Sequence, residues 1–353
     1  MFELRSNQPA SRWQMPAETA PHDATWMAWP GSGYTLGESA AEAEIARATW
    51  AAVANAIVAR EPLRMLVPPH ERPHARRLLD PAIELHEVRL DDAWYRDIGP
   101  TFVVGADQHG GPALGAVNWV FNGWGQQDWA TWEHDAVASL VATSASCAHR
   151  IDSPMVNEGG GIHTDGAGTF LVTETVQLDP GRNAGWTRQA VEDELARTVG
   201  ARKVIWLPRG LTRDSEKFGT RGHVDIVATF ADRGVVLLHE QRNDAHPDAA
   251  VSRELATVFH GEHDAEGKPI EVVALPAPTQ LRDAVGWVDW SYVNHYVCNG
   301  AVIACAFDDP ADAEAREVLA AAYPGRDVVQ IDARPIFDRG GGIHCITQQQ
   351  PAL

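Results

Sequence analysis

The sequence contains few cysteines and few basic residues. Its four cysteines, at positions 147, 298, 305 and 345 of 353, include no Cys-x-x-Cys pair, which argues against a disulfide framework. The 29 lysines and arginines are outnumbered by 48 acidic residues, and the net charge is −19. This charge argues against nucleic acids and anionic membranes as partners. It suits a small cationic substrate, although many proteins that bind no cation are equally acidic.

Long apolar runs are also missing. No stretch is long enough to span a bilayer, and the polar segment Met1–Met15 lacks the apolar core of a signal peptide. We therefore expect a soluble, cytoplasmic protein with no membrane partner. Residues 1–24 are polar and rich in proline, so we expect them to run over the surface.

What the chain does contain is an internal repeat. Gly159-Gly160-Gly161-Ile162-His163-Thr164 returns as Gly340-Gly341-Gly342-Ile343-His344-Cys345, 181 residues further on. Glycines let the backbone approach a ligand closely, and the junction of a loop and a strand is a usual place for a catalytic group. Cys345 is therefore a candidate nucleophile, although an isolated cysteine in an apolar run is more often a small buried hydrophobe.

A longer rhythm surrounds this repeat, in which a helix, a strand, a polar segment and a hairpin follow one another. The predicted helices cover residues 42–60, 132–145, 188–199, 249–259 and 312–322, and strands cover 63–67, 151–156, 204–207, 270–275 and 328–331. Alternating helices and strands are also typical of a doubly wound sheet. A hairpin in every unit instead favours a closed radial array, as in propellers. We therefore predict one α/β-propeller domain over residues 1–353.

In such an array the polar segments meet at a central pocket. The candidate nucleophile Cys345 would lie there with His223, a candidate general acid or base. Asp97, Glu158 and Asp225 would supply carboxylates. Each carboxylate alone would more often be a solvated loop residue or a helix cap. Their coincidence with the repeat is what indicates a site.

The order of residues along an extended strand predicts which side chains face the pocket. His223 and Asp225 are two residues apart, so both would point to one face. His344 is adjacent to Cys345 and would point away from it if the segment is extended. We therefore prefer His223 as the catalytic partner of the thiol.

Carboxylates around a cysteine indicate chemistry on a guanidinium group. Two carboxylates can hold its planar N–H pairs in a bidentate manner, and a thiolate can attack its central carbon. A protonated histidine can then protonate the departing nitrogen. Trp94 and Trp124 are candidates to stack on the cation or its alkyl stem. Nothing in this scheme requires a cofactor or a metal ion, and we expect neither.

Six short segments, spread over almost the whole chain, carry a family resemblance. They are Met15-Pro16-Ala17-Glu18, Trp26-Met27-Ala28-Trp29-Pro30, Trp94-Tyr95-Arg96-Asp97-Ile98-Gly99-Pro100, Glu158-Gly159-Gly160, Gly222-His223-Val224-Asp225 and Ile343-His344-Cys345-Ile346-Thr347-Gln348-Gln349. In this order they resemble the agmatine deiminase (agmatine iminohydrolase) family of the guanidino-group-modifying superfamily.

The resemblance implies a five-bladed pseudo-symmetric α/β propeller. It implies hydrolysis of a guanidine, most simply agmatine, to the ureido product N-carbamoylputrescine and ammonia, through an amidino intermediate on Cys345. His223 would be the general acid and base. Asp97 and Asp225 would grip the guanidinium, with Glu158 close to them. No cofactor is implied, and a homodimer stays open.

Three residues beside the expected site depart from the pattern that the resemblance implies. Arg221 precedes the Gly-His-x-Asp segment, where Asp or Asn is usual. Ile226 follows this segment, where Asn is usual, and Gly342 also stands where Asn is usual. Arg221 and Gly342 are therefore candidates to contact the far end of the substrate. An arginine would suit an anionic group there. Alternatively, Arg221 pairs with a nearby acid, for which the candidates are Asp214, Glu216 and Glu158.

Other functions stay open. The substrate could be arginine, a guanidino acid or peptidyl-arginine, and an amidinotransferase would pass the amidino group to an amine instead of water. A metal site would combine His163, His223, His344 and Cys345, but these have no spacing typical of zinc. A non-catalytic member of the superfamily would have no need of the complete set of Cys, His and acids.

Overall fold

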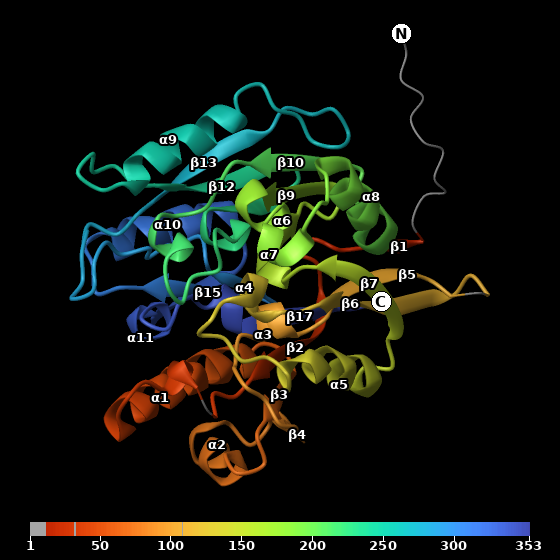
Figure 1. Ribbon diagram of the computed structural model, residues 1–353, viewed down its shortest axis with the longest axis vertical. Helices are drawn as coiled ribbons and strands as arrows, with labels where there is room; N and C mark the ends of the chain where they lie inside the picture. Colours follow the sequence, from red (N-terminus) through yellow and green to blue (C-terminus); the bar gives the residue numbers. More distant parts are fainter. Residues whose placement is uncertain (1–11, 32, 108) are drawn as a thin grey trace.

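The strands form five small sheets in the computed structural model, which describes residues 12–31, 33–107 and 109–353 (Figure 1). This arrangement excludes a single doubly wound sheet. One sheet contains β1 (Trp13–Gln14), β5 (Thr101–Ala106), β6 (Pro112–Val120) and β7 (His149–Val156). A second contains β8 (Ile162–Thr164), β9 (Thr169–Thr173) and β10 (Lys203–Leu207). A third contains β11 (Ala228–Asp232), β12 (Val235–Glu240) and β13 (Glu271–Pro276).

Of the other two sheets, one lies in the C-terminal part of the chain and the other joins its two ends. They contain β14 (Tyr296–Cys298), β15 (Ala301–Ala306) and β16 (Asp327–Asp332), and then β2 (His22–Ala28), β3 (Leu63–Val67), β4 (Glu84–Glu87) and β17 (Thr347–Pro351). Each sheet combines an antiparallel pair with a parallel neighbour, as in β14–β15 and β15–β16. β17 pairs antiparallel with β2, so the strand that follows Cys345 is held by a strand from the other end of the chain.

Helices connect the strands and lie mostly on the outside (Figure 1). The longer ones are α1 (Ala40–Val58), α2 (Arg72–Leu78), α5 (Ala138–Ala145), α8 (Arg188–Val199), α9 (Asp248–Val258) and α10 (Ala311–Ala322). Four of them pack on the last strand of a neighbouring sheet: α8 on β7, α9 on β10, α10 on β13 and α1 on β16. Because α1 near the start of the chain packs on β16 near its end, the helix packing links the last unit back to the first.

Short helical segments begin or interrupt the hairpins. They are α3 (Tyr95–Ile98), α4 (Gly123–Gln126), α6 (Glu174–Gln177), α7 (Pro180–Asn183) and α11 (Arg334–Phe337), with the 3₁₀ turns η1 (Tyr34–Leu36), η2 (Asp135–Val137), η3 (Gly159–Gly161), η4 (Arg213–Ser215), η5 (Val224–Ile226) and η6 (His344–Ile346). Among these, α3 contacts both η3 and η6, and η3 contacts η5. Four polar segments from distant parts of the chain therefore meet at one place.

The helix ends follow from local chemistry. Ser39 and Glu42 form a capping box that begins α1. Thr187 caps the first turn of α8, and Gly200 ends it in the left-handed conformation. The predicted helix 188–199 and strand 63–67 match α8 and β3 residue for residue, whereas the helix predicted over 132–145 is shorter and begins as the turn η2.

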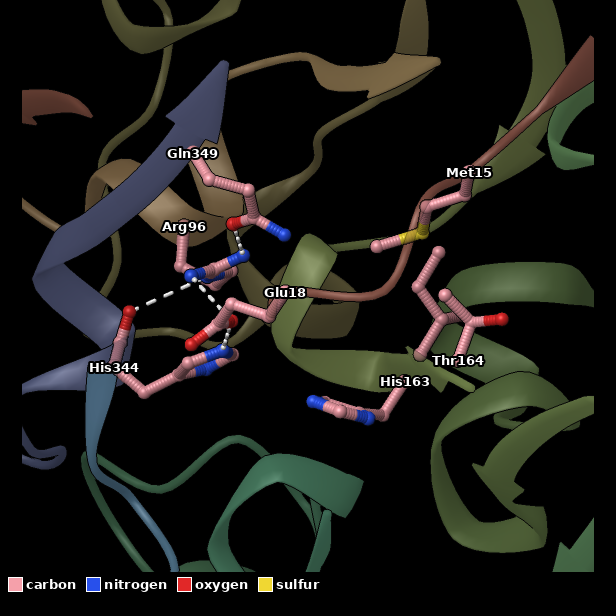
Figure 2. A pocket seen from close by; sticks show the side chains of 8 residues that line it. Met15, Glu18, Arg96, His163, Thr164, His344 and Gln349 are labelled. Carbon is pink, nitrogen blue, oxygen red and sulfur yellow. Dashed lines mark hydrogen bonds and ion pairs between the residues drawn. The ribbon is translucent and has the colours of Figure 1, made fainter. Parts of the chain in front are cut away.

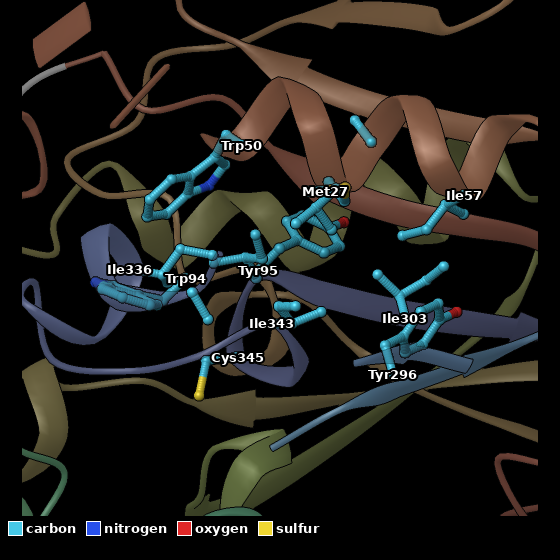
Figure 3. Packing of buried hydrophobic residues seen from close by; sticks show 14 of the residues in the cluster. Met27, Trp50, Ile57, Trp94, Tyr95, Tyr296, Ile303, Ile336, Ile343 and Cys345 are labelled. Carbon is cyan, nitrogen blue, oxygen red and sulfur yellow. The ribbon is translucent and has the colours of Figure 1, made fainter. Parts of the chain in front are cut away.

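The largest apolar cluster supports the segment around Cys345. Trp50 from α1, Trp94, Tyr95 and Ile343 are buried in it, and Cys345 lies at its edge with the thiol directed away from the apolar side chains (Figure 3). The cysteine is thus held by a rigid core on one side, while its sulfur faces polar groups on the other.

The N-terminal segment departs from expectation. Residues 1–11 lie outside the described residues, but from residue 12 onward the segment is not a surface strap. Trp13, Met15, Glu18 and His22 are all buried. The polar, Pro-rich composition indicated exposure wrongly, because isolated side chains of this segment enter the core. No helix in the described ranges is long and apolar enough to cross a membrane.

Candidate active site

Five predicted residues come from four short turns that meet at Gly160. Asp97 lies in α3, Glu158 precedes η3, His223 and Asp225 belong to η5, and Cys345 lies in η6. A methyl group on Gly160 would lie 2.5 Å from His223 Nδ1, 3.0 Å from Asp225 Oδ2 and 3.1 Å from Asp97 Oδ1. Three functional side chains therefore face the same point of backbone, which glycine leaves open.

This geometry predicts a large effect of Gly160→Ala. The Gly160 backbone is not in the left-handed region, so alanine fits its conformation, but the added methyl must displace His223 and a carboxylate. Displacement of about 1 Å costs roughly 100-fold in rate, and we expect kcat/KM for the substrate to fall at least that far with the fold retained. Gly286→Ala is the control, because a methyl there meets no described atom within 4 Å. Wild-type kcat/KM in Gly160→Ala would show that the point is not the reaction site.

His223 is held in its charged form by two acids. Its Nε2 lies 3.1 Å from Glu158 Oε2, and its Nδ1 lies 3.8 Å from Asp97 Oδ1. Burial lowers the pKa of His223, but Asp97 and Glu158 outweigh this and raise it to about 9. Nδ1 has no hydrogen-bond partner among the described residues. The ring is therefore protonated near neutral pH and offers one N–H toward the meeting point.

Glu158 is itself anchored by a buried arginine. Arg182 Nε donates to both Glu158 oxygens at 3.1 and 3.0 Å, and neither side chain is exposed. Burial raises the pKa of Glu158, but Arg182 and His223 outweigh it and lower the pKa to about 2. Glu158 thus remains a carboxylate that orients His223 through Nε2 and leaves Nδ1 toward the site.

The two aspartates differ in their surroundings. Asp97 Oδ2 accepts a hydrogen bond of 2.9 Å from Trp124 Nε1. Burial, with a contribution from Glu158 and Asp225, raises the pKa of Asp97 to about 6, although the charge on His223 lowers it. Asp225 Oδ2 lies 2.7 Å from His344 Nδ1, and Asp225 Oδ1 has no hydrogen-bond partner among the described residues. A buried acceptor without a partner costs about 1–3 kcal/mol. This oxygen is therefore ready for a donor from a ligand.

Cys345 is protonated in the empty site. Its Sγ lies 3.3 Å from Asn294 Nδ2 and 3.8 Å from Asp225 Oδ2. Burial raises the pKa of the thiol well above its usual value, and Asp225 and Asp97 raise it further. Trp94 lies close by, because a methyl on Gly341 would meet the Trp94 ring at 2.8 Å and the Cys345 sulfur at 3.0 Å. A cation bound by the aspartates would remove the charge that suppresses thiol ionisation.

The expectation for His344 was wrong. Positions 344–346 form the 3₁₀ turn η6 and not an extended strand. In a turn, adjacent side chains do not alternate between two faces, and Asp225 Oδ2 meets both His344 Nδ1 at 2.7 Å and Cys345 Sγ at 3.8 Å. His223 and Asp225 do share a direction, but also through a turn, η5, and not through strand alternation.

The candidate substrate-binding residues have protein partners. The guanidinium of Arg221 donates to Asp179 at 2.7 and 2.8 Å, whereas Asp214, one of the acids considered from the sequence, is met only by the backbone, where Arg221 N–H donates to the Asp214 carbonyl at 2.8 Å. Gly342 packs against Asn294 and Phe337, so a side chain there would displace Asn294 from the thiol. The third departure, Ile226, belongs to an apolar core cluster.

Several neighbours of the site were not found from the sequence. Glu18 had a signal, since it ends the segment Met15-Pro16-Ala17-Glu18, but it was assigned to the surface. Arg96 had a signal of the same kind, since it lies in the segment Trp94-Tyr95-Arg96-Asp97. Asn294, whose amide contacts Cys345, was not singled out as a site residue. Arg182 gave no signal, because a charge in a turn is ordinary until its buried partner is known.

The alternative of a metal site built from His163, His223, His344 and Cys345 is not supported by their positions. Glu18, His163 and His344 could offer ligand atoms within 4.8 Å of one another (Figure 2), whereas His223 and Cys345 are not part of this group. These donors are already engaged. His163 accepts the Phe230 N–H at Nδ1, and His344 Nε2 lies 2.8 Å from Glu18 Oε2. Chemistry on a cation by thiol, imidazole and carboxylates is what the residues at Gly160 can support.

The comparisons with known proteins agree with this fold. The Porphyromonas-type peptidyl-arginine deiminase family matches residues 14–351, so the chain belongs to this family. A Streptomyces coelicolor protein named "Putative agmatine deiminase" is 53% identical over 96% of this chain and 99% of its own length. The agmatine deiminase of Stutzerimonas stutzeri is 38% identical over 100% of this chain and 99% of its own. The solved agmatine deiminase of Enterococcus faecalis superposes with a TM-score of 0.88 at 28% identity, covering 99% of both chains.

Proposed function

We propose that this chain hydrolyses agmatine to N-carbamoylputrescine and ammonia. The observation that carries the proposal is the meeting of His223, Asp97 and Asp225 at Gly160, with Cys345 Sγ 3.8 Å from Asp225 Oδ2. Two buried polar atoms there, His223 Nδ1 and Asp225 Oδ1, have no hydrogen-bond partner among the described residues. A planar guanidinium offers N–H donors for both aspartates and an electrophilic carbon for the thiol. The relatives named agmatine deiminase support this substrate.

The first half of the proposed reaction forms a covalent intermediate. The guanidinium binds Asp97 and Asp225, which neutralises their effect on Cys345, and the thiol gives its proton to solvent water, from which the thiolate takes it back when the product leaves. The thiolate attacks the guanidinium carbon and gives a neutral tetrahedral adduct. His223 donates its proton to one NH₂ group, and the C–N bond breaks. Ammonia departs, and the amidino group remains bound to the sulfur. Neutral His223 remains beside the intermediate.

The second half returns the enzyme to its starting state. His223 takes a proton from water, and the hydroxide adds to the amidino carbon. Collapse of this adduct breaks the C–S bond and releases the ureido product, while the proton of the new hydroxyl group passes to ammonia. The thiolate is regenerated and His223 is protonated again. The reaction written in this way consumes one water molecule and requires neither a metal ion nor a cofactor.

We also propose that residues 1–353 form a single five-bladed α/β propeller. The five sheets, the repeated antiparallel and parallel pairing, and the helix packing that runs from the last unit to the first support this. In that arrangement the turns bearing the catalytic residues lie at the centre. A propeller places them there from four separate units, which explains their wide spacing along the chain.

The pairing of Arg221 favours agmatine over substrates with a carboxylate. Asp179 accepts two bonds from Arg221 and one of 2.9 Å from Arg182, so both arginines compete for this acid. An arginine engaged in this way has less to offer an anionic ligand. We propose Trp94 as the aromatic face beside the reacting carbon, since it lies next to Gly341 and Cys345. Trp124 instead donates to Asp97 Oδ2, so its contact is with this acid.

A panel of guanidines tests the proposal. Agmatine, arginine, a guanidino acid and a peptidyl-arginine would be compared by ammonia release and by ureido product. We expect agmatine to have the highest kcat/KM and equal yields of the two products. A preference for arginine or a guanidino acid would transfer the assignment to that substrate. Loss of agmatine without ammonia, in the presence of an amine, would identify an amidinotransferase.

A further inference from the structure

We infer that His344 is a positioning residue for the reaction, held as an imidazolium between Glu18 and Asp225 so that Asp225 stays ionised. This inference rests on the proposed function for its kinetic consequences. Its structural content, the charge on His344, is independent of the substrate. Figure 2 shows the ring of His344 directed at Glu18, with Arg96 on the far side of that carboxylate.

The charge follows from the hydrogen bonds of the ring. His344 Nε2 lies 2.8 Å from Glu18 Oε2, and Nδ1 lies 2.7 Å from Asp225 Oδ2. An ionised carboxylate only accepts hydrogen bonds. A neutral imidazole would therefore direct one nitrogen lone pair at a carboxylate oxygen. Both contacts are satisfied when both nitrogens carry a proton and both acids are ionised.

The groups around His344 are consistent with one trapped positive charge. Burial and Arg96 lower the pKa of His344, but Glu18 and Asp225 raise it further, so the net shift is upward. Arg96 is occupied, because it donates to Gln349 Oε1 at 2.7 Å and to Glu18 Oε2 at 3.4 Å. The remaining neighbour rings, His163 and His295, have their pKa values lowered by burial to about 3 and about 4, and are neutral.

The internal repeat supplies a matched comparison. His163 occupies the same place in its Gly-Gly-Gly-Ile-His segment as His344, and the two rings are 6.1 Å apart. His163 Nδ1 accepts the Phe230 N–H at 3.2 Å, so it carries a lone pair, and its Nε2 lies 2.7 Å from the Thr229 hydroxyl. The two repeated histidines therefore differ in charge because, of the two, only His344 is hydrogen-bonded to carboxylates in the described part of the chain.

The consequence concerns how Asp225 meets a ligand. His344 occupies Oδ2, and Oδ1 has no hydrogen-bond partner within the part of the chain that the structure describes. Asp225 is buried beside Asp97, which favours protonation of one of the pair. The imidazolium opposes this, and the pKa of Asp225 is lowered in spite of burial. His344 thus keeps Asp225 ionised and holds its Oδ2, so that Oδ1 can bind the ligand, without itself touching the substrate.

Two measurements test the inference. In ¹⁵N-histidine NMR of the wild-type protein, we expect the His344 ring to show both nitrogens protonated through neutral pH, and the His163 ring to be neutral. In kinetics, His344→Gln removes the charge opposite a buried acid and should raise the pKa of Asp225 by about one unit or more. Because Asp97 sets the first acid limb, protonation of Asp225 should appear as a steeper fall of kcat/KM for agmatine below that limb. The loss should be greatest at low pH and partly recovered at high pH, and Glu18→Gln should steepen the fall in the same way.

The control is His163→Gln, for which we expect no steepening of the fall at low pH. A neutral His344 ring in the wild-type protein would overturn the inference, whether or not agmatine is turned over. A loss in His344→Gln that is equal at all pH values would also overturn it, since that is the result of a purely structural role. If His344→Gln fails to fold, the NMR measurement and the Glu18→Gln profile still decide. Failure of the proposed function alone would appear as inactive wild-type protein with a protonated His344.

Discussion

Replacing Cys345 with alanine is expected to abolish turnover. The variant lacks the sulfur that attacks the guanidinium carbon, and removal of a catalytic nucleophile costs roughly 10⁴-fold or more in kcat. The fold should persist, because the side chain is small and lies at the edge of the apolar cluster. Ammonia release from agmatine and the thermal unfolding temperature are the two measurements.

A second buried thiol provides the control for this variant. Cys298 is buried in β14, and we expect Cys298→Ala to keep kcat near the wild-type value. The comparison separates loss of the nucleophile from loss of a buried sulfur. Activity within a few-fold of wild type in Cys345→Ala would end the assignment of Cys345.

Replacing either aspartate with asparagine should lower kcat/KM strongly. Each change removes a charged hydrogen bond to the guanidinium, which contributes about 1.5–3 kcal/mol, so we expect a loss of roughly 10- to 100-fold. Asp225→Asn should lose more than Asp97→Asn. It also leaves the positive His344 at 2.7 Å beside an amide, whereas the donors bonded to Asp97, Trp124 Nε1 and Gly160 N–H, are neutral and the charged His223 lies at 3.8 Å.

The pH profile distinguishes the aspartates further. Asp97 has a pKa of about 6 and must be ionised, so wild-type kcat/KM should fall as pH drops through this value. His223 has a pKa of about 9 and must be protonated, so kcat/KM should fall again above it. Asp97 helps to hold the proton on His223, so Asp97→Asn should move the alkaline limb to lower pH. Near wild-type kcat/KM in both variants would refute guanidinium binding by this pair.

Regular elements could be predicted because their signals are local. The spacing of apolar residues and the glycine after Val199 define the helix 188–199, and two prolines after Val67 end the strand 63–67. The repeat predicted which segments carry functional residues. Asp97, Glu158, His223, Asp225 and Cys345 do meet, because each stands at the same point of its unit.

The finer geometry of the site could not be predicted. A turn of three residues such as η6 is too short to show a period, so the direction of His344 was wrong. The partner of His344, Glu18, is separated from it by 326 positions. Arg221 likewise reaches Asp179 in a different unit, at a distance of 42 residues. Such pairs depend on how the units pack, and local sequence carries no record of that packing.

The covalent intermediate is the central claim, and mass spectrometry of the quenched reaction tests it most directly. The enzyme would be mixed with agmatine, quenched in acid during turnover, and measured intact and after proteolysis, with Cys345→Ala treated in the same way. We predict an added mass equal to agmatine less one ammonia, located on the peptide that contains Cys345 and absent from the variant. An adduct on any other residue, or one that persists in Cys345→Ala, would contradict the account.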